Sequence, residues 1–239
     1  MPSAAGPTGE MVCLDMHLDR RVFLSSTAIG TLAIACGGTA SHAEHPGNDD
    51  DDVTPAEDLM REHGVLRRIM YLYDEAAMRL DTRADVPLDV IASAAAMIRR
   101  VIEDYHEKLE ENYLFPRFEQ ANKLTDLTAT LRKQHERGRV ITDEITSSAK
   151  GTLADGDRAK LAATLRRFNR MYRAHAARED TVLFPEIRKL VGKKAYAELG
   201  DQFEDKERDM LGPEGFEHAV LDIAKLEQAF GLDDLAKLT

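Results

Sequence analysis

The sequence has no tryptophan and only two cysteines, and both of these, Cys13 and Cys36, lie before residue 50. The rest of the 239-residue chain therefore has no thiol, which excludes a disulfide framework and a sulfur-rich metal site from it. A metal bound there must take nitrogen and oxygen ligands. Acidic residues outnumber basic ones, 43 to 32, so the formal net charge is −11, and no basic stripe is visible, which argues against nucleic acid as a partner.

Long apolar runs are missing as well. Arg20 and Arg21 precede a Val-Phe-Leu sequence and an apolar run that continues to Ala35, which resembles a twin-arginine export signal. The run is shorter than the roughly 20 residues of a membrane-spanning helix. We therefore expect residues 1–43 to be a signal peptide that takes the protein through the export machinery to the periplasm or beyond. Alternatively, the arginines are the positive end of another type of signal.

The end of this signal is open to two interpretations. Residues 41–43 (Ser-His-Ala) and 38–40 (Gly-Thr-Ala) both have small residues at the spacing of ordinary signal cleavage. Residues 33–36 (Ala-Ile-Ala-Cys) resemble instead a lipoprotein box, in which a lipid on Cys36 would be the only membrane anchor. Residues 44–53, with four consecutive aspartates, are typical of an acidic flexible linker.

The remaining sequence favours amphipathic helices over strands. It is rich in Ala, Leu, Glu, Lys and Arg, and apolar residues recur at helical spacing. Thr54-Pro55-Ala56-Glu57 is a capping box with proline at the first helical position, so a helix begins there and fades by about residues 81–85. Further helices are expected from Pro87 to Pro116, where proline ends or kinks the helix, and at about 124–149, 157–190, 193–211 and 214–230.

These segments predict an all-α fold. Four long helices joined by short polar loops describe an up-down-up-down four-helix bundle over residues 54–190. The two short C-terminal helices would form an extension at 191–239, separated by Gly212-Pro213.

A duplicated motif carries the chemistry. The pattern His-x-x-x-Glu-x-x-x-Leu-Phe-Pro begins at His106 and again, 69 residues later, at His175, and one further histidine precedes each copy. Residues at i and i+4 lie on one helical face, so each copy can direct an imidazole and a carboxylate at a metal inside a helix bundle. The six candidate metal ligands are His63, His106, Glu110, His135, His175 and Glu179.

This ordered series, with both Leu-Phe-Pro continuations, resembles the hemerythrin-like (HHE cation-binding) domain over roughly residues 55 to 190. The resemblance implies a non-haem centre of two iron ions bridged by two carboxylates. It implies that Glu110 and Glu179 are the bridges and that the terminal iron ligands are His63, His106, His135 and His175.

One position departs from the family pattern. Arg139 stands four residues after His135, where true hemerythrins have a fifth histidine. One iron would then take water, hydroxide, a tyrosine or an exogenous molecule, and Tyr172 and Tyr105 are candidates, although a tyrosine in an apolar stripe usually packs. We therefore expect a protein that binds dioxygen, nitric oxide or a related small diatomic or peroxide ligand in sensing, storage or detoxification.

Other interpretations remain open. The ligand set also suits manganese or zinc. The same centre would be an enzyme if it turned over peroxide, nitric oxide or ferrous iron, although the sequence identifies no catalytic group. A metal-free structural bundle is a further alternative.

Two other metal-site motifs fit the sequence poorly. A ferritin-like site needs Glu-x-x-His twice, and only Glu103 with His106 provides it; a zinc protease helix needs histidine rather than Glu110. His218 lies outside the repeat and is expected at the surface.

Overall fold

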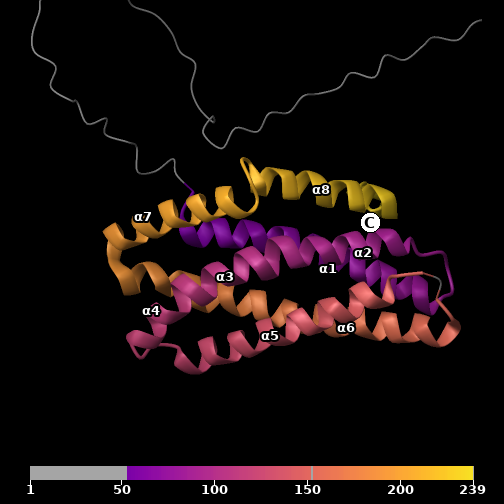
Figure 1. Cartoon of the computed structure of the whole chain (residues 1–239), viewed down its shortest axis with the longest axis horizontal. Coiled ribbons are helices and arrows are strands. Elements are labelled where there is room, and N and C mark those ends of the chain that lie inside the picture. The colour runs from indigo at the N-terminus through magenta and orange to yellow at the C-terminus, as the bar shows by residue number, and fades with distance from the viewer. Residues whose placement is uncertain (1–52, 152, 239) are drawn as a thin grey trace, which may run out of the picture. The chain divides into compact units, whose positions relative to one another are not determined.

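A computed structural model describes residues 53–151 and 153–238 of the chain. The regular structure of these residues is entirely helical, so the predicted all-α class is confirmed (Figure 1). The predicted signal peptide, Cys36 and the acidic linker up to residue 52 lie outside the described residues. Within the described ranges, no helix has the length and apolar character that a membrane span requires.

The first helix, α1 (Pro55–Asp81), begins and ends where the sequence predicts. The Thr54 side chain accepts a hydrogen bond from the backbone N–H of Glu57 at 3.3 Å, and Pro55 occupies the first turn, where no intrahelical donor is required. One face of α1 is buried throughout its length, which makes it a central element of the bundle.

The second predicted helix is a helical run from Leu88 to Gln120 in which α-helical and π-helical turns alternate. Pro116 does not end this run, because it lies in the first turn of an α-helix that follows a wider π-helical turn, and proline is tolerated in a first turn. The elements are α2 (Leu88–Met97), η1 (Ile98–His106), α3 (Glu107–Leu109), η2 (Glu110–Leu114) and α4 (Phe115–Gln120).

The second half of the chain repeats this local structure. Each motif glutamate begins a π-helical turn, and each Phe-Pro pair begins the following α-helix, so the duplicated sequence corresponds to a duplicated backbone. Gly192, at φ 79°, divides the last long helix and marks the start of the predicted C-terminal extension. The elements are α5 (Thr125–Ser148), α6 (Asp155–Arg178), η3 (Glu179–Leu183), α7 (Phe184–Met210), α8 (Gly215–Phe230) and the short 3₁₀ turn η4 (Leu235–Leu238).

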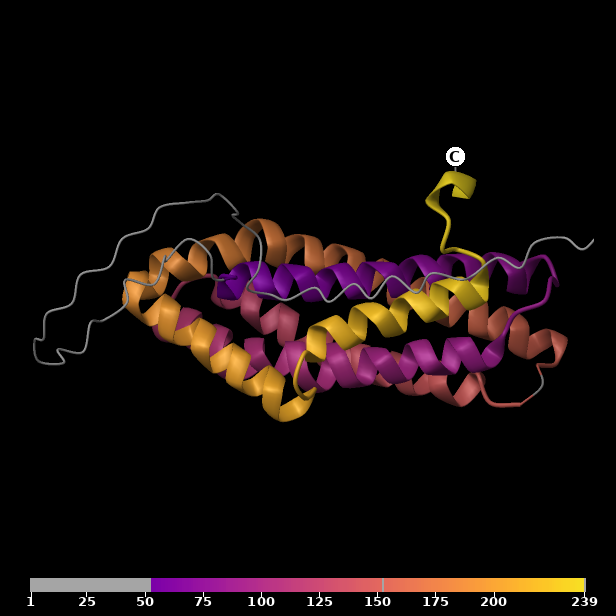
Figure 2. The ribbon, with the colours of Figure 1, turned by 90° about the horizontal axis from the view of Figure 1, so that it is seen from above.

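The helices pack as a bundle with an interrupted core. The helix α1 packs along α6, which also contacts α5, and α8 lies across α1 and α2 (Figure 2). The buried apolar residues form two clusters, one containing Leu66, Ile98 and Phe168 and the other containing Leu59 and Phe115. On α1 the boundary between the clusters falls at residues 61–64, so a polar layer at the level of the predicted ligands separates two apolar layers.

Two glycines inside helices provide a matched test of this packing. A Cβ at Gly64 on α1 would meet nothing within 4 Å, whereas one at Gly138 on α5 would lie 1.9 Å from the Tyr172 hydroxyl oxygen. We expect Gly64→Ala to raise the free energy of unfolding by about 1 kcal/mol, through helix propensity. Gly138→Ala should lower it by about 1–3 kcal/mol, because Tyr172 must move. Urea unfolding measures both, and equal shifts for the two variants would contradict the described packing.

Candidate metal centre

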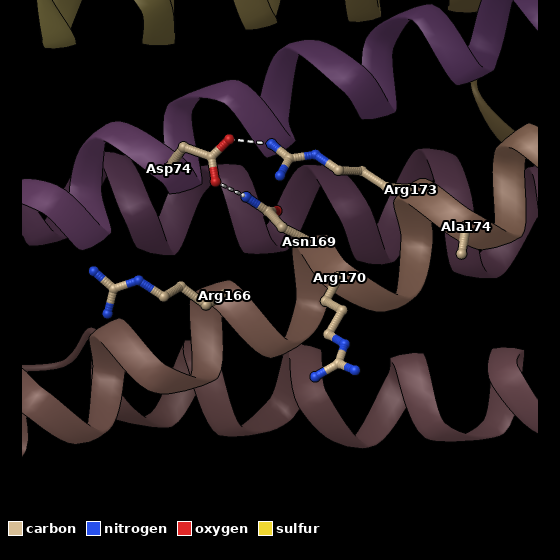
Figure 3. A pocket seen from close by; sticks show the side chains of 6 residues that line it. All are labelled: Asp74, Arg166, Asn169, Arg170, Arg173 and Ala174. Atoms are coloured by element: carbon tan, nitrogen blue, oxygen red, sulfur yellow. Dashed lines mark hydrogen bonds and ion pairs between the residues drawn. The ribbon is translucent and has the colours of Figure 1, made fainter.

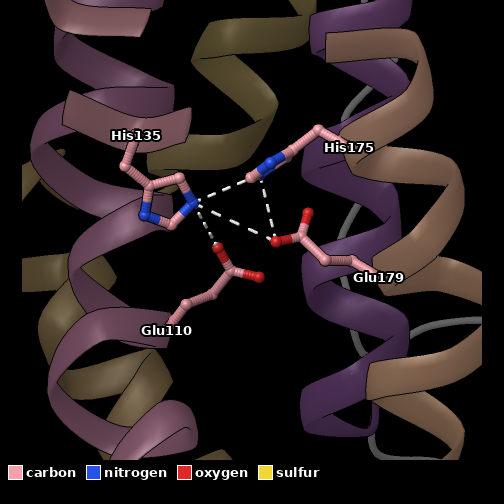
Figure 4. Close-up of side chains that lie close together, drawn as sticks. All are labelled: Glu110, His135, His175 and Glu179. Atoms are coloured by element: carbon pink, nitrogen blue, oxygen red, sulfur yellow. Dashed lines mark hydrogen bonds and ion pairs between the residues drawn. The ribbon is translucent and has the colours of Figure 1, made fainter. Parts of the chain in front are cut away.

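The six predicted ligands converge in the centre of the bundle. Each is at most 3% exposed. Their donor atoms form two groups, each within 4.8 Å, and Glu179 belongs to both. Figure 4 shows the larger group. One group contains Glu110, His135, His175 and Glu179, and the other contains His63, His106 and Glu179.

The Glu179 carboxylate lies between two histidines from different helices. Its Oε1 is 3.0 Å from Nε2 of His175, and its Oε2 is 3.4 Å from Nε2 of His63. One oxygen therefore faces each donor group. A carboxylate in this position can bridge two cations.

Glu110 lies between the other two histidines. Its Oε2 is 3.4 Å from Nε2 of His135 and 3.7 Å from Nε2 of His106. The two carboxylates thus connect all four imidazoles. This arrangement is compatible with two metal ions that share both carboxylates.

Each imidazole is held by a side-chain acceptor at Nδ1, the ring nitrogen on the opposite side from the Nε2 that faces a central carboxylate. A ring nitrogen that donates its proton outward fixes the tautomer and leaves Nε2 available for a metal. The four Nδ1 contacts are His63 to Asp180 at 2.7 Å, His106 to Glu62 at 2.6 Å, His135 to Glu111 at 3.0 Å and His175 to Gln134 at 2.9 Å.

These four outer partners were not among the predicted site residues, yet the sequence contains a signal for them. Glu62 and Gln134 directly precede the first histidine of each half, and Glu111 and Asp180 directly follow the two motif glutamates. The same polar positions therefore recur in both halves. Their targets could not be read from spacing, because each hydrogen bond joins two different helices.

The duplicated phenylalanine also packs at this level of the bundle. Phe115 stacks on His135 with ring centroids 5.6 Å apart, and Phe184 stacks on His63 at 5.5 Å. Each phenylalanine thus covers a histidine from another helix. This contact is a structural reason for the Leu-Phe-Pro continuation of both motifs.

The two central carboxylates lack the hydrogen bonds that buried carboxylates normally have. No described residue donates a hydrogen bond to either oxygen of Glu110 or Glu179, and Nε2 of His106 also has no partner. Burial and the adjacent Glu179 carboxylate raise the pKa of Glu110 well above its usual range. Cations would supply the missing partners, so the donor set fits a metal cluster.

The position of the absent fifth histidine belongs to a polar network. Arg139 donates to Glu107 at 2.7 Å and to Glu111 at 2.6 Å, and the Tyr172 hydroxyl donates to the other oxygen of Glu107 at 2.9 Å. The proposed tyrosine ligand therefore already has a partner, while Tyr105 is buried in an apolar cluster. Burial, which outweighs the attraction of Arg139, raises the pKa of Glu107 to about 8.

Two other residues considered from the sequence lie outside the ligand groups. His218 is exposed on α8, as predicted. Glu103 accepts a hydrogen bond from Thr142 at 2.5 Å and pairs with Arg99 at 2.8 Å, so this carboxylate is occupied and gives no support to a ferritin-like arrangement.

A separate pocket of about 640 Å³ opens between α1 and α6 (Figure 3). Three of its residues form links across the helices, since Arg173 pairs with Asp74 and Asn169 donates to the same carboxylate at 2.8 Å. None of the six predicted ligands lines this pocket. The lining residues are Asp74, Arg166, Asn169, Arg170, Arg173 and Ala174.

Comparison with known proteins agrees with this geometry. The family model described as the hemerythrin HHE cation binding domain matches residues 54–187. Two relatives, one from Mycobacterium bovis and one from Mycobacterium tuberculosis, both named as uncharacterized proteins, are 40% identical over 227 residues, which is 90% of this chain and 88% of each relative. No solved structure is significantly similar to the chain.

Removal of a predicted ligand should lower the metal content. We expect His63→Ala or Glu179→Ala to lose at least half of the iron bound by the native chain, because each removes a donor from the centre. His218→Ala is the matched control and should bind as much iron as the native protein. Iron determination on the three folded variants checks the assignment, and equal iron in all of them would refute it.

Metal binding should release protons. Burial lowers the pKa of His63, but the hydrogen bond to Asp180 and the charge of the nearby Glu179 carboxylate outweigh this and raise it to about 9. Without metal, His63 is therefore protonated at pH 7, and a metal must displace that proton. We expect the affinity of the metal-free protein for ferrous iron to rise from pH 6 to pH 9. Loading with iron should also release protons, which a pH indicator in weakly buffered solution detects. An affinity that is constant over this range would contradict the protonation described.

Proposed function

The chain belongs to the hemerythrin HHE cation-binding family, and from this premise we propose that it is an exported non-haem di-iron protein that binds dioxygen, nitric oxide or a related small oxidant. Its role would be sensing, storage or detoxification of that ligand. The predicted up-down-up-down order of the four main helices would place one or more ligands from each helix inside the bundle.

The observation that carries this proposal is the pair of buried carboxylates without hydrogen-bond donors. An unpartnered buried polar group costs about 1–3 kcal/mol, and more when it is charged, so a metal-free structural bundle gives no reason to retain them. His63 and His106 would hold one iron, His135 and His175 the other, and Glu110 and Glu179 would bridge the two ions. Manganese and zinc suit the same donors, and membership of the family favours iron.

The burial of the centre limits the size of its exogenous ligand. All six donors lie in the interior between two apolar clusters, and phenylalanines stack on two of the histidines. When bound, the iron pair would supply electrons to a small oxidant. The protein orients the imidazoles through their Nδ1 partners and keeps bulk water out of the site. A diatomic molecule or peroxide is the appropriate ligand class.

Glu107 favours a second candidate function, an enzyme that acts on peroxide, nitric oxide or ferrous iron. Its carboxyl group accepts a hydrogen bond from the Tyr172 hydroxyl and lies within 4.8 Å of a His135 ring nitrogen, and its pKa of about 8 allows it to give or accept a proton near neutral pH. Turnover needs such a proton donor, whereas simple binding does not. The two candidates share one metal centre and differ in their kinetics.

Export rests on the sequence around Arg20 and Arg21. The twin-arginine route carries folded, cofactor-loaded proteins, which suits a metal centre buried inside a bundle. The mature protein would be periplasmic, with a lipid anchor at Cys36 as the alternative to release.

Metal analysis and optical spectroscopy of the protein from the export compartment test the proposal. We expect about two irons per chain and absorption bands that disappear with dithionite and change with azide, dioxygen or nitric oxide. Steady-state assays with hydrogen peroxide, in the native chain and in Glu107→Gln, then distinguish binding from turnover. Arg20→Lys/Arg21→Lys should keep the protein out of the exported fraction.

Three outcomes would count against the proposal. Absence of iron after anaerobic ferrous reconstitution would leave a structural bundle. Sustained peroxide turnover by the native chain, with a lower rate in Glu107→Gln, would identify the protein as an enzyme rather than a ligand-binding protein. Unchanged export of the double arginine variant would refute the twin-arginine route.

A further inference from the structure

The two halves of the centre have the same construction but different charge. His63 and His106, the first pair, are both held by carboxylates, Asp180 and Glu62. The second pair, His135 and His175, is held by one carboxylate and by the neutral amide of Gln134, whose Oε1 lies 2.9 Å from Nδ1 of His175. Glu62 and Gln134 occupy equivalent positions, each directly before the first histidine of its half.

The carboxylates that hold the first histidine of each half both have cationic partners. Asp180, which holds His63, pairs with Arg67. Glu111, which holds His135, pairs with both Lys108 and Arg139, and Arg139 also contacts Glu107. Asp180 and Glu111 are thus alike in being carboxylates paired with cations, so the difference in outer acceptor between the two pairs lies at Glu62 and Gln134.

Glu62 contacts its histidine in the buried interior of the bundle. Glu62 is 1% exposed and lies 2.6 Å from Nδ1 of His106, so little water screens it. A carboxylate that accepts the outer ring proton makes an imidazole a more basic, more electron-rich ligand than an amide does. Such a ligand stabilises the more highly charged state of its metal.

We propose that Glu62 and Gln134 make the two metal positions electronically unequal, so that the position held by His63 and His106 favours ferric iron and the position held by His135 and His175 favours ferrous iron. This inference rests on the proposed di-iron function. A single electron from an external reductant would enter the diferric centre at the His135–His175 position and reduce that iron from ferric to ferrous. Glu62 and Gln134 act as positioning residues, since both work through the histidine that they hold.

The test is a potentiometric titration of the iron-loaded full chain with dithionite, followed by optical absorption and paramagnetic resonance. The variants are Gln134→Glu, Glu62→Gln and the double exchange, each of which keeps a hydrogen-bond acceptor of the same size. We expect two one-electron steps in the native protein. Gln134→Glu should lower the reduction potential of the first step, and Glu62→Gln should raise the reduction potential of the second. Each shift should be about 59 mV, which corresponds to a tenfold change in the ferric-to-ferrous ratio of that iron.

Both single variants should therefore bring the two steps closer together, and the double exchange should restore their separation. A purely structural role for these residues would lower the iron content without opposite shifts of the potentials. Potentials that stay unchanged, or that move in the same direction in both single variants, would overturn the inference in a protein that still holds two irons. A native chain without iron would overturn the proposed function, and this inference with it.

Discussion

The structure depends on the burial of two carboxylates, Glu110 and Glu179, in the middle of an apolar bundle. Neither accepts a hydrogen bond from any described residue, and each has imidazole nitrogens within 4 Å. Charges so placed are costly unless cations compensate them. Other features of the centre position the groups that would share those cations. They include the π-helical turns that begin at these two residues and the outer hydrogen-bond partners of the histidines.

Duplication explains how one chain builds such a centre from helices far apart in sequence. Each half contributes a histidine, a His-x-x-x-Glu turn and a phenylalanine, and the halves exchange their outer contacts: Asp180 of the second half holds His63, and Glu111 of the first half holds His135. Neither half is complete alone, because its first histidine takes its acceptor from the other. Arg67 and Arg139 are also equivalent, since each pairs with the carboxylate that holds the first histidine of its half. The equivalence ends at Gln134, which replaces the carboxylate of Glu62, and at Tyr172, which binds Glu107.

Much of the fold could be predicted because the signals are local. The capping box at Thr54 placed the first helix correctly, and Gly212-Pro213 lies between the last two helices as expected. The effect of Pro116 was harder to predict from the sequence, because the helix continues to Gln120 after the π-helical turn that precedes the proline. The surface position of His218 is confirmed, whereas the roles of the six predicted ligands remain a prediction that their convergence supports.

By itself, the sequence determined the set of donors and their arrangement within each helix, because the i to i+4 spacing puts His106 beside Glu110 and His175 beside Glu179 on any α-helical backbone. Only the tertiary structure decided which donors face one another across helices and which neighbours hold them. Those contacts depend on the rotation and axial offset of each helix, which the packing of both apolar clusters sets. Spacing along the chain therefore could not reveal that Glu62 holds His106, or that Arg139 binds Glu107 and Glu111.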